Sequence, residues 1–319
     1  MRRQILMSQT YNPELTPEIR DRIKFMEEIS LNAWPSHKIE LYDGWLIRFS
    51  RNYTYRTNAV EQIGPSSIPV DQKVAYCEKI YHDFGTPSIF KINPLISPSF
   101  DQLLANRGYD IRHVTQTMTA NLDHVRLMKS DLSKYEFDNR RGLPSEVHYS
   151  PARIPSVHSA ASADEDFPSQ TQEVGIPGEW KPFSVLLNCY ITEEWMNGLF
   201  HLNGTSNPEL RRIVRYMYAA IPKYTIAASI EIDGRMVASG LGICDRDYIG
   251  IYAVYVSPGC RRRHYARAVL STLLREGKRH GAEKAYLQVV KGNIPAKSLY
   301  YSVGFRDFYT YWFRSRWIS

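Results

Sequence analysis

The sequence predicts a mixed α/β fold of the α+β type, in which twisted, mostly antiparallel sheets are flanked by helices. Residues 248–305 alternate strand, helix, strand and helix. Asp43-Gly44 and Asp233-Gly234 each stand between strand-like runs, as in tight hairpins. The order of elements in the first half of the chain also recurs in the second half. We therefore expect two domains of similar architecture.

The unit at 248–305 begins with a strand that ends in a basic turn. β-Branched and aromatic residues fill the run from Tyr248 to Val256, and Pro258 stops the strand because it has no N–H for the ladder. Three arginines follow, and apolar residues then recur at helical spacing up to Gly277. A helix start offers free N–H groups and a positive dipole end, so the turn suits a pyrophosphate. A merely solvated basic face is the alternative.

A second strand and a short helix complete this unit. Residues 286–290 predict a buried strand. Asn293 precedes a helix that carries Pro295 at an early position, where proline is well tolerated. Gly304 followed by Phe305 is typical of a helix end and a new strand.

Three segments of this unit resemble the signature of the GNAT superfamily of acyl-CoA-dependent N-acetyltransferases. They are Val254-Tyr255-Val256-Ser257-Pro258, Arg261-x-x-His264-x-Ala266 and Asn293-x-x-Ala296-x-x-Leu299-Tyr300-x-x-x-Gly304-Phe305. The resemblance covers residues 183–319 well and the remainder weakly. It implies a catalytic GNAT domain at 183–319 that transfers an acetyl group from acetyl-CoA to a primary amine by direct attack.

The resemblance also implies a role for each matching residue. Backbone groups of Val254, Tyr255 and Val256 would face the pantetheine arm and thioester, and N–H groups there would stabilise the oxyanion. The pyrophosphate would lie on Arg261, Arg262, Arg263, His264, Tyr265, Ala266 and Arg267. Asn293 would contact acetyl-CoA, and Tyr300 would donate a proton to the leaving thiolate.

Two positions depart from the family pattern. His264 stands where the family usually has glycine, which lets phosphates approach the backbone closely. Gln288 stands where a branch that acetylates protein N-termini has a glutamate base, so the base must be elsewhere or be water. The nearest carboxylates in sequence, Glu231, Asp245 and Asp247, are predicted to be turn or surface residues.

Composition limits the remaining classes. The 319 residues are 43% apolar, and the four cysteines form no C-x-x-C pair, as expected of a cytoplasmic protein. The nine histidines show no ligand spacing, so we expect no metal. No run is long enough for a membrane span. The net charge of +7 permits a nucleic-acid or ribosome partner, but the chain has no such motif and we do not expect one. A monomer or homodimer is expected.

The first half, residues 1–125, is predicted to be a degenerate GNAT-like domain. Its elements are predicted as a helix at 14–33, a hairpin with strands 39–41 and 45–49, a strand at 56–62, a helix at 69–84, a strand at 88–92, a helix at 99–106 and strands to about residue 122. Aligning Gly108 on Gly304 places Leu104 on Tyr300 and Ser97 on Asn293. This half therefore lacks the acid and the asparagine.

Residues 126–182 are predicted to form a partly irregular linker, or alternatively a lid over the active site, because they are rich in Ser, Pro and Ala. The second half then predicts a strand at 183–190, helices at 193–200 and 208–221, strands at 225–232 and 236–244, and a final hairpin strand at 308–314.

The acceptor is not specified by any motif. In GNAT proteins the helices at 193–200 and 208–221 often shape the acceptor pocket. Candidate walls are therefore Trp195, Tyr216 and Tyr218, with Trp34, Trp45 and Arg56 from the first half, and core packing is the alternative for the aromatic residues. We favour a small-molecule amine or amino acid, with a protein N-terminus or lysine as the alternative. A non-catalytic acyl-CoA-binding regulatory module is the second alternative.

Overall fold

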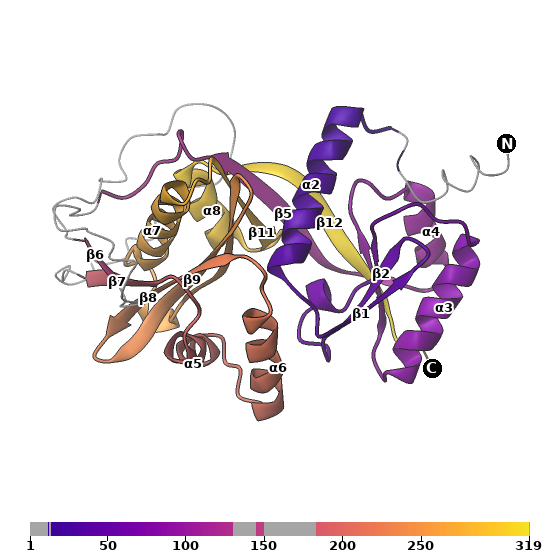
Figure 1. Ribbon diagram of the computed structural model, residues 1–319, viewed down its shortest axis with the longest axis horizontal. Helices are drawn as coiled ribbons and strands as arrows, with labels where there is room; N and C mark the ends of the chain where they lie inside the picture. The colour runs from indigo at the N-terminus through magenta and orange to yellow at the C-terminus, as the bar shows by residue number, and fades with distance from the viewer. Residues whose placement is uncertain (1–11, 13, 130–144, 150–182, 319) are drawn as a thin grey trace, which may run out of the picture.

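The computed structural model describes residues 12, 14–129, 145–149 and 183–318 (Figure 1). Most of the predicted linker or lid at 126–182 lies outside the described residues. Helices α5 to α8 gather in one lobe and helices α3 and α4 in another, and the long strands β5 and β12 run through both (Figure 1).

The mixed α/β composition is confirmed, and most predicted elements are present. The first half contains α2 (Pro17–Ala33), β1 (Lys38–Tyr42), β2 (Trp45–Phe49), the 3-10 helix η1 (Tyr55–Thr57), β3 (Glu61–Gln62), α3 (Val70–Asp83), β4 (Ser88–Ile92), α4 (Pro98–Asn106) and β5 (Asp110–Asn121). The second half contains β6 (Ser145–Tyr149), β7 (Phe183–Asn188), α5 (Glu193–Leu202), α6 (Pro208–Ala219), β8 (Tyr224–Ile232), β9 (Arg235–Asp245), β10 (Tyr248–Val256), η4 (Pro258–Cys260), α7 (Tyr265–Arg279), β11 (Lys284–Val290), α8 (Ile294–Val303) and β12 (Arg306–Arg316).

Local sequence fixes where many of these elements begin and turn. Five helices start at a residue whose side-chain oxygen accepts a hydrogen bond from a first-turn N–H, namely Thr16, Ser97, Thr192, Asn207 and Asn293. At both predicted hairpins the two central residues have positive φ, with 44° and 78° at Asp43-Gly44 and 51° and 71° at Asp233-Gly234.

The two halves share one nine-stranded sheet with the order β4-β12-β5-β11-β10-β9-β8-β7-β6. Strand β5 of the first half lies between β11 and β12 of the second half, and β12 in turn lies between β4 and β5 (Figure 1). The β11–β5 pairing runs from Lys284↔Asn121 to Val290↔Thr115. Each half therefore completes its sheet with the last strand of the other half.

Two predicted strands differ from the structure. Residues 308–314 belong to β12, which pairs with β4 and β5 and not with a hairpin neighbour. Within 56–62 only Glu61–Gln62 is a strand, because local side-chain bonds stabilise a helical turn instead. Thr54 Oγ1 accepts from Arg56 N at 3.1 Å, and Asn58 Nδ2 donates to Thr54 O at 2.7 Å. The strands predicted up to residue 122 are the single strand β5.

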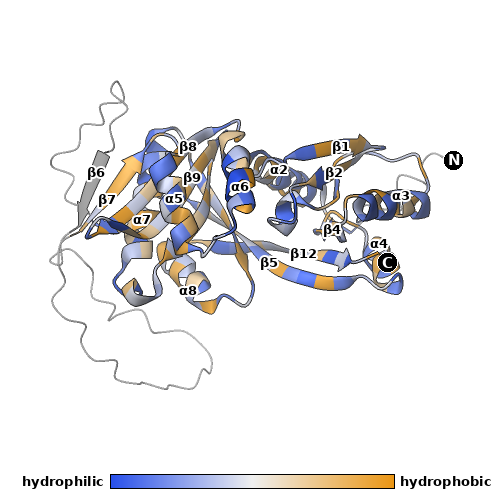
Figure 2. Ribbon diagram, turned by 90° about the horizontal axis from the view of Figure 1, so that it is seen from below, coloured by the Kyte–Doolittle hydropathy of each residue, from blue (hydrophilic) through white to orange (hydrophobic). Residues whose placement is uncertain are grey.

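Helices cover both faces of the sheet. One hydrophobic cluster joins α7 and α8 to one face, and it includes Leu270, Leu273, Leu287 and Val303. Another joins α2, α5 and α6 to the opposite face, and it includes Ile29, Trp195, Val214 and Leu241. Figure 2 shows apolar residues along β7 and β9 between these helices. Burial on both faces explains why the central strands are largely apolar.

The halves repeat one order of elements, β3-α3-β4-α4-β5 and β10-α7-β11-α8-β12. Ser97 and Asn293 cap the equivalent helices α4 and α8, and the glycines that end these helices, Gly108 and Gly304, both have positive φ. Leu104 lies fully buried at the position equivalent to Tyr300. These positions match the predicted alignment, whereas the exact domain boundaries remain predictions.

In the first half the turn before α3 is closed by a carboxylate from the β1–β2 hairpin. Asp43 accepts hydrogen bonds from the backbone N–H of Ser67 and of Ile68, both at 2.9 Å. Lys73 Nζ lies 3.3 Å from the same carboxylate and 4.1 Å from the centre of the buried Trp45 ring. Partial burial raises the pKa of Asp43, but the bonds from Ile68, Ser67 and Lys73 outweigh it and lower that pKa to about 2.

We predict that Asp43→Asn lowers the free energy of unfolding by about 2–3 kcal/mol at pH 7, because Lys73 loses its buried counter-charge. Asparagine tolerates the positive φ, so the hairpin turn is retained. The folded-state pKa is depressed, so the loss is full above the usual value of 3.8 and fades as the pH falls towards 2. Denaturant unfolding between pH 2 and 7 measures it, with the exposed Asp83→Asn as control. Equal stability of both variants at pH 7 would contradict this account.

We also predict that residues 183–319 alone do not form a stable monomer. Without β5, strand β11 presents an unpaired edge and the core loses Met118, Ala120 and Leu122. Size-exclusion chromatography and circular dichroism of this fragment should show aggregation, and co-expression with residues 1–129 should restore a soluble complex. A folded, monomeric 183–319 fragment would show that the exchanged strand is dispensable.

Candidate active site

A cavity of about 480 Å³ opens between the C-terminal ends of β10 and β11. Its walls come from both halves of the chain. The lining residues are Trp34, Tyr53, Thr54 and Arg56 of the first half, and Leu199, Asn203, Thr205, Tyr218, Ile251, Tyr252, Ala253, Val254, Tyr255, Gln288, Val289, Val290, Asn293, Ala296 and Tyr300 of the second half.

The cavity exists because two parallel strands diverge. β10 and β11 pair from Tyr248↔Lys284 to Ile251↔Leu287, and beyond that point β11 continues to pair with β5. The register of β10 against β9 shifts between Tyr252 and Tyr255, where Ala253 has a φ of 48°. This bulge takes the backbone of 253–254 out of the regular ladder and aims it at the cavity wall.

Of the three strand residues predicted to face acetyl-CoA, two line the cavity. They are Val254 and Tyr255. Val256 instead pairs with Ala238 of β9, and its side chain packs against the hydrophobic cluster under α7. The predicted contact of Val256 is therefore limited to its backbone.

Tyr300 lies on α8 with its ring buried and 8% of the residue exposed. The ring packs edge-on against Phe305 with 6.0 Å between centroids. Burial raises the pKa of Tyr300 to about 12, so the phenol keeps its proton at neutral pH. Tyr300 is one of the residues that line the cavity, and no hydrogen bond to its hydroxyl is found among the described residues.

Asn293 also lines the cavity, but its side chain has a structural role as well. Its Oδ1 accepts from the N–H of Ala296 at 3.3 Å and so caps α8, the helix that carries Tyr300. The capping bond uses the amide oxygen and leaves the NH₂ group for a ligand.

The basic turn directly continues β10 and ends where α7 begins. Arg262 and His264 have φ values of 63° and 58°. The histidine thus adopts the left-handed conformation for which the family's glycine is suited. It precedes α7 without a side-chain cap bond. Burial, followed by the charges of Arg267 and Arg262, lowers the pKa of His264 and favours the neutral imidazole at pH 7.

The other six residues of the predicted pyrophosphate site differ in exposure and in their contacts. Arg261, Arg262 and Arg263 are exposed, with their positive charges beside the first turn of α7. Tyr265 is buried and packs edge-on against Phe183, so only its backbone can face a ligand. Arg267 donates to Ser302 Oγ at 2.8 Å and to Arg126 O at 3.2 Å, so it ties α7 to α8. Ala266 is half-buried between these residues.

The acceptor-wall residues predicted from sequence are only partly present. Trp34, Arg56 and Tyr218 line the cavity. Trp45 lies in the core of the first half beneath Lys73, Trp195 is buried with Nε1 donating to Ala228 O, and Tyr216 is an exposed residue of α6. Sequence analysis missed Tyr53 and Thr54, although both flank Arg56 in the same short segment.

Gln288 is held in place by its neighbours. Its Oε1 accepts from Arg56 Nε and from the Tyr311 hydroxyl, both at 3.0 Å, and its Nε2 donates to Ser30 Oγ at 3.0 Å. An amide so bonded positions the arginine and accepts no proton.

The three carboxylates considered as bases do not line the cavity. Asp245 is buried, contrary to the surface position predicted, and Lys223 Nζ lies 2.8 Å from its carboxylate. Asp247 pairs with Lys284 at 2.8 Å. Among the described lining residues there is no Asp, Glu or His, so within this part of the chain the cavity has no protein base.

In the described part of the chain, no cluster of His, Cys, Asp or Glu is arranged to hold a metal ion. None of the described helices combines the length and apolar character that crossing a bilayer requires.

Known proteins resemble this chain at the levels of sequence and fold. Residues 191–305 match the sequence profile of the acetyltransferase (GNAT) family. "Uncharacterized N-acetyltransferase YobR" of Bacillus subtilis (strain 168) is 22% identical over 285 residues, which cover 89% of this chain and 95% of that protein.

Two solved structures share the fold over most of the chain. A GCN5-related N-acetyltransferase from Kribbella flavida has a TM-score of 0.57 at 12% identity, covering 94% of this chain and 96% of its own. A tandem GNAT protein from the clavulanic acid biosynthesis pathway has a TM-score of 0.52 at 11% identity, covering 81% and 74%. The profile match identifies an acetyltransferase (GNAT) domain at residues 191–305, and the two solved structures show that the chain shares the fold of GNAT proteins over most of its length.

Proposed function

We propose that this protein transfers an acetyl group from acetyl-CoA to the primary amine of a small molecule or amino acid. The observation that carries the proposal is that Tyr300, a protonated phenol at neutral pH, lines the cavity between the diverging strands. A cytoplasmic location and a monomeric or homodimeric state remain predictions.

The basic turn fits an acyl-CoA pyrophosphate. Arg261, Arg262 and Arg263 are exposed beside the start of α7, where N–H groups and the dipole favour an anion. In the first half the equivalent turn before α3 already binds the Asp43 carboxylate. We therefore assign one acyl-CoA site per chain, in the second half.

The proposed reaction needs few protein groups. A neutral amine attacks the thioester carbon, and the new C–N bond gives a tetrahedral intermediate with an oxyanion. The C–S bond then breaks, the departing thiolate takes the Tyr300 proton, and the tyrosine regains a proton from water. Backbone N–H groups at 253–255 stabilise the oxyanion of the intermediate. The proton of the attacking amine leaves to water, because the described cavity wall holds no Asp, Glu or His.

Calorimetric titration with acetyl-CoA tests the proposal first, and we expect about one site per chain. Arg262→Ala should weaken binding by about 3- to 10-fold at low salt, and less at high salt, because this arginine is exposed. Lys79→Ala removes an exposed charge on α3 and serves as the matched control. No binding would contradict the enzyme assignment, and two sites would contradict the closed turn of the first half. Binding without thiol release from any amine would favour the non-catalytic alternative.

The pH dependence of turnover tests the role of Tyr300. We expect kcat/KM to rise with pH in step with the neutral fraction of the amine and to show no falling limb below about pH 10, since the pKa of Tyr300 is raised to about 12. Tyr300→Phe should lower kcat by about 100-fold, whereas Tyr301→Phe, on the exposed side of the same helix, should not. Full turnover by Tyr300→Phe across this pH range would remove the acid from the mechanism.

A further inference from the structure

The charge of the cavity wall limits what an acceptor can be. Among the described lining residues Arg56 carries the only formal charge, and the others are aromatic, aliphatic or neutral polar residues. An acceptor with a second ammonium group would find no counter-charge in this part of the chain. An acceptor with an anionic group would find the guanidinium group of Arg56.

Arg56 is held by one edge of its guanidinium group. Its Nε donates to Tyr311 OH at 2.8 Å and to Gln288 Oε1 at 3.0 Å. Its backbone is fixed as well, because its N–H donates to Thr54 Oγ1 and its carbonyl accepts from Arg48 Nη1 at 2.6 Å. Among the described residues neither terminal nitrogen of Arg56 has a hydrogen-bond partner or an acidic residue within ion-pair distance. These two nitrogens are the pair that binds a carboxylate in bidentate fashion.

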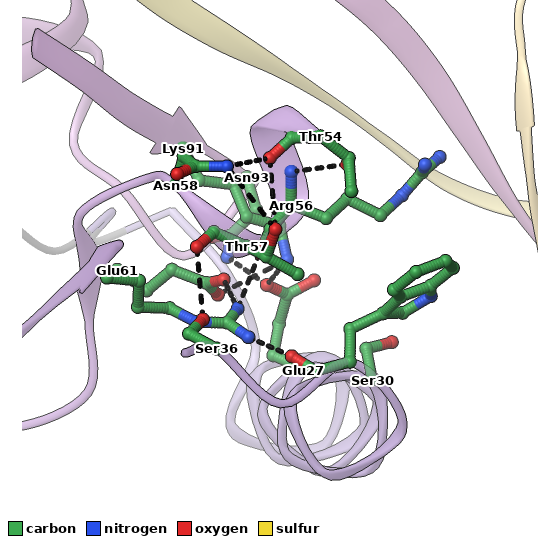
Figure 3. Close-up of polar contacts among 12 residues, drawn as sticks. Glu27, Ser30, Ser36, Thr54, Arg56, Thr57, Asn58, Glu61, Lys91 and Asn93 are labelled. Atoms are coloured by element: carbon green, nitrogen blue, oxygen red, sulfur yellow. Dashed lines mark hydrogen bonds and ion pairs between the residues drawn. The ribbon is translucent and has the colours of Figure 1, made fainter. Parts of the chain in front are cut away.

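The carboxylates in the cluster beside Arg56 form ion pairs with other basic residues. Behind its backbone lies a buried cluster in which Glu61 pairs with Arg48 at 2.9 Å and with Lys91 at 3.3 Å, while Lys91 also pairs with Glu27 at 2.7 Å. Two acids and two bases balance each other there. Figure 3 shows the backbone of Arg56 beside this cluster and its side chain extending away from it. The positive charge of Arg56 is thus left for a ligand.

The position of Arg56 relative to the reacting groups also fits. Burial raises the pKa of Tyr255, and the positive charge of Arg56 makes this rise smaller. Tyr255 adjoins the bulge of β10, where the thioester is proposed to lie. Arg56 and the bulge residues Ala253 and Val254 line the same cavity, so an acceptor bound at Arg56 lies in the cavity where the thioester is proposed to lie.

From this geometry we propose that the acceptor is a small amine that carries a carboxylate, such as an amino acid, and that Arg56 binds this carboxylate. The inference rests on the proposed acetyl transfer and names its substrate class. Gln288 and Tyr311 are positioning residues, because they act through Arg56 and line or support the cavity behind it. The first half of the chain then supplies acceptor specificity to the second.

Turnover of matched acceptors tests the inference. A panel of amino acids and their primary amides is compared at equal concentrations of the neutral amine, because the two series differ in amine pKa. We expect the best amino acid to exceed its amide by about 10-fold or more in kcat/KM. Arg56→Gln should abolish this ratio by raising KM for the acid much more than KM for the amide. Arg51→Gln changes an exposed arginine of the same segment, whose partner is Glu209, and should keep the ratio.

Binding in the absence of acetyl-CoA separates the two proposals. N-acetylated amino acids and their amides are titrated calorimetrically into the wild type and Arg56→Gln. A preference for the acid that disappears in the variant, with no transfer of acetyl groups, would leave the anion site standing and remove the proposed function. Transfer that is equally fast for acids and amides would overturn the anion site alone.

Two milder variants test whether the effect of Arg56→Gln results from a loss of structure. Arg56→Lys keeps the charge but loses the bidentate edge, and Tyr311→Phe removes one of the two acceptors of Nε. Both should reduce the acid-to-amide ratio by about 3-fold or more while acetyl-CoA affinity stays unchanged. If both variants bind acetyl-CoA normally and retain the full ratio, Arg56 does not contact the acceptor.

Discussion

The pairing of β5 with both β11 and β12 is the constraint on which the rest of the structure depends. Because β5 takes the place beside β11, the second half cannot close its sheet alone, and β12 is released to complete the first half beside β4. The same exchange brings the segment at 53–56 over the ends of β10 and β11. The exchange of β5 and β12 thereby joins both halves in one sheet, and residues of both halves line the cavity.

Two copies of one arrangement have acquired different chemistry through a few side chains. In the second half the turn before the long helix α7 has three exposed arginines and an uncapped helix start. In the first half the corresponding turn donates its N–H groups to Asp43, and Leu104 fills the position of Tyr300. Both helix starts suit an anion, and in the first half that anion is the Asp43 side chain of the chain itself.

Sequence reasoning succeeded where the signal is local. The hairpin turns and the periodicity of α7 predicted elements that the structure contains, and the alignment of Gly108 on Gly304 predicted the likeness of the two halves. It failed where distant segments decide the outcome. Tertiary contacts between residues far apart in sequence decide three such outcomes. They are the pairing of 306–316 with β4 and β5, the burial of Asp245 beside Lys223, and the separation of Trp45 from Trp34. Periodicity within a segment carries no information about such partners.

The exchange of strands also dictates an order of events during synthesis. β5 leaves the ribosome more than a hundred residues before β11 and β12, which are its only neighbours within the described sheet. Until β11 emerges, β5 has two unpaired edges, and until β12 emerges the first half lacks the strand between β4 and β5. Unpaired edges of this kind promote association with other chains. The time between the synthesis of β5 and that of β12 is therefore the interval in which these edges are open to such association.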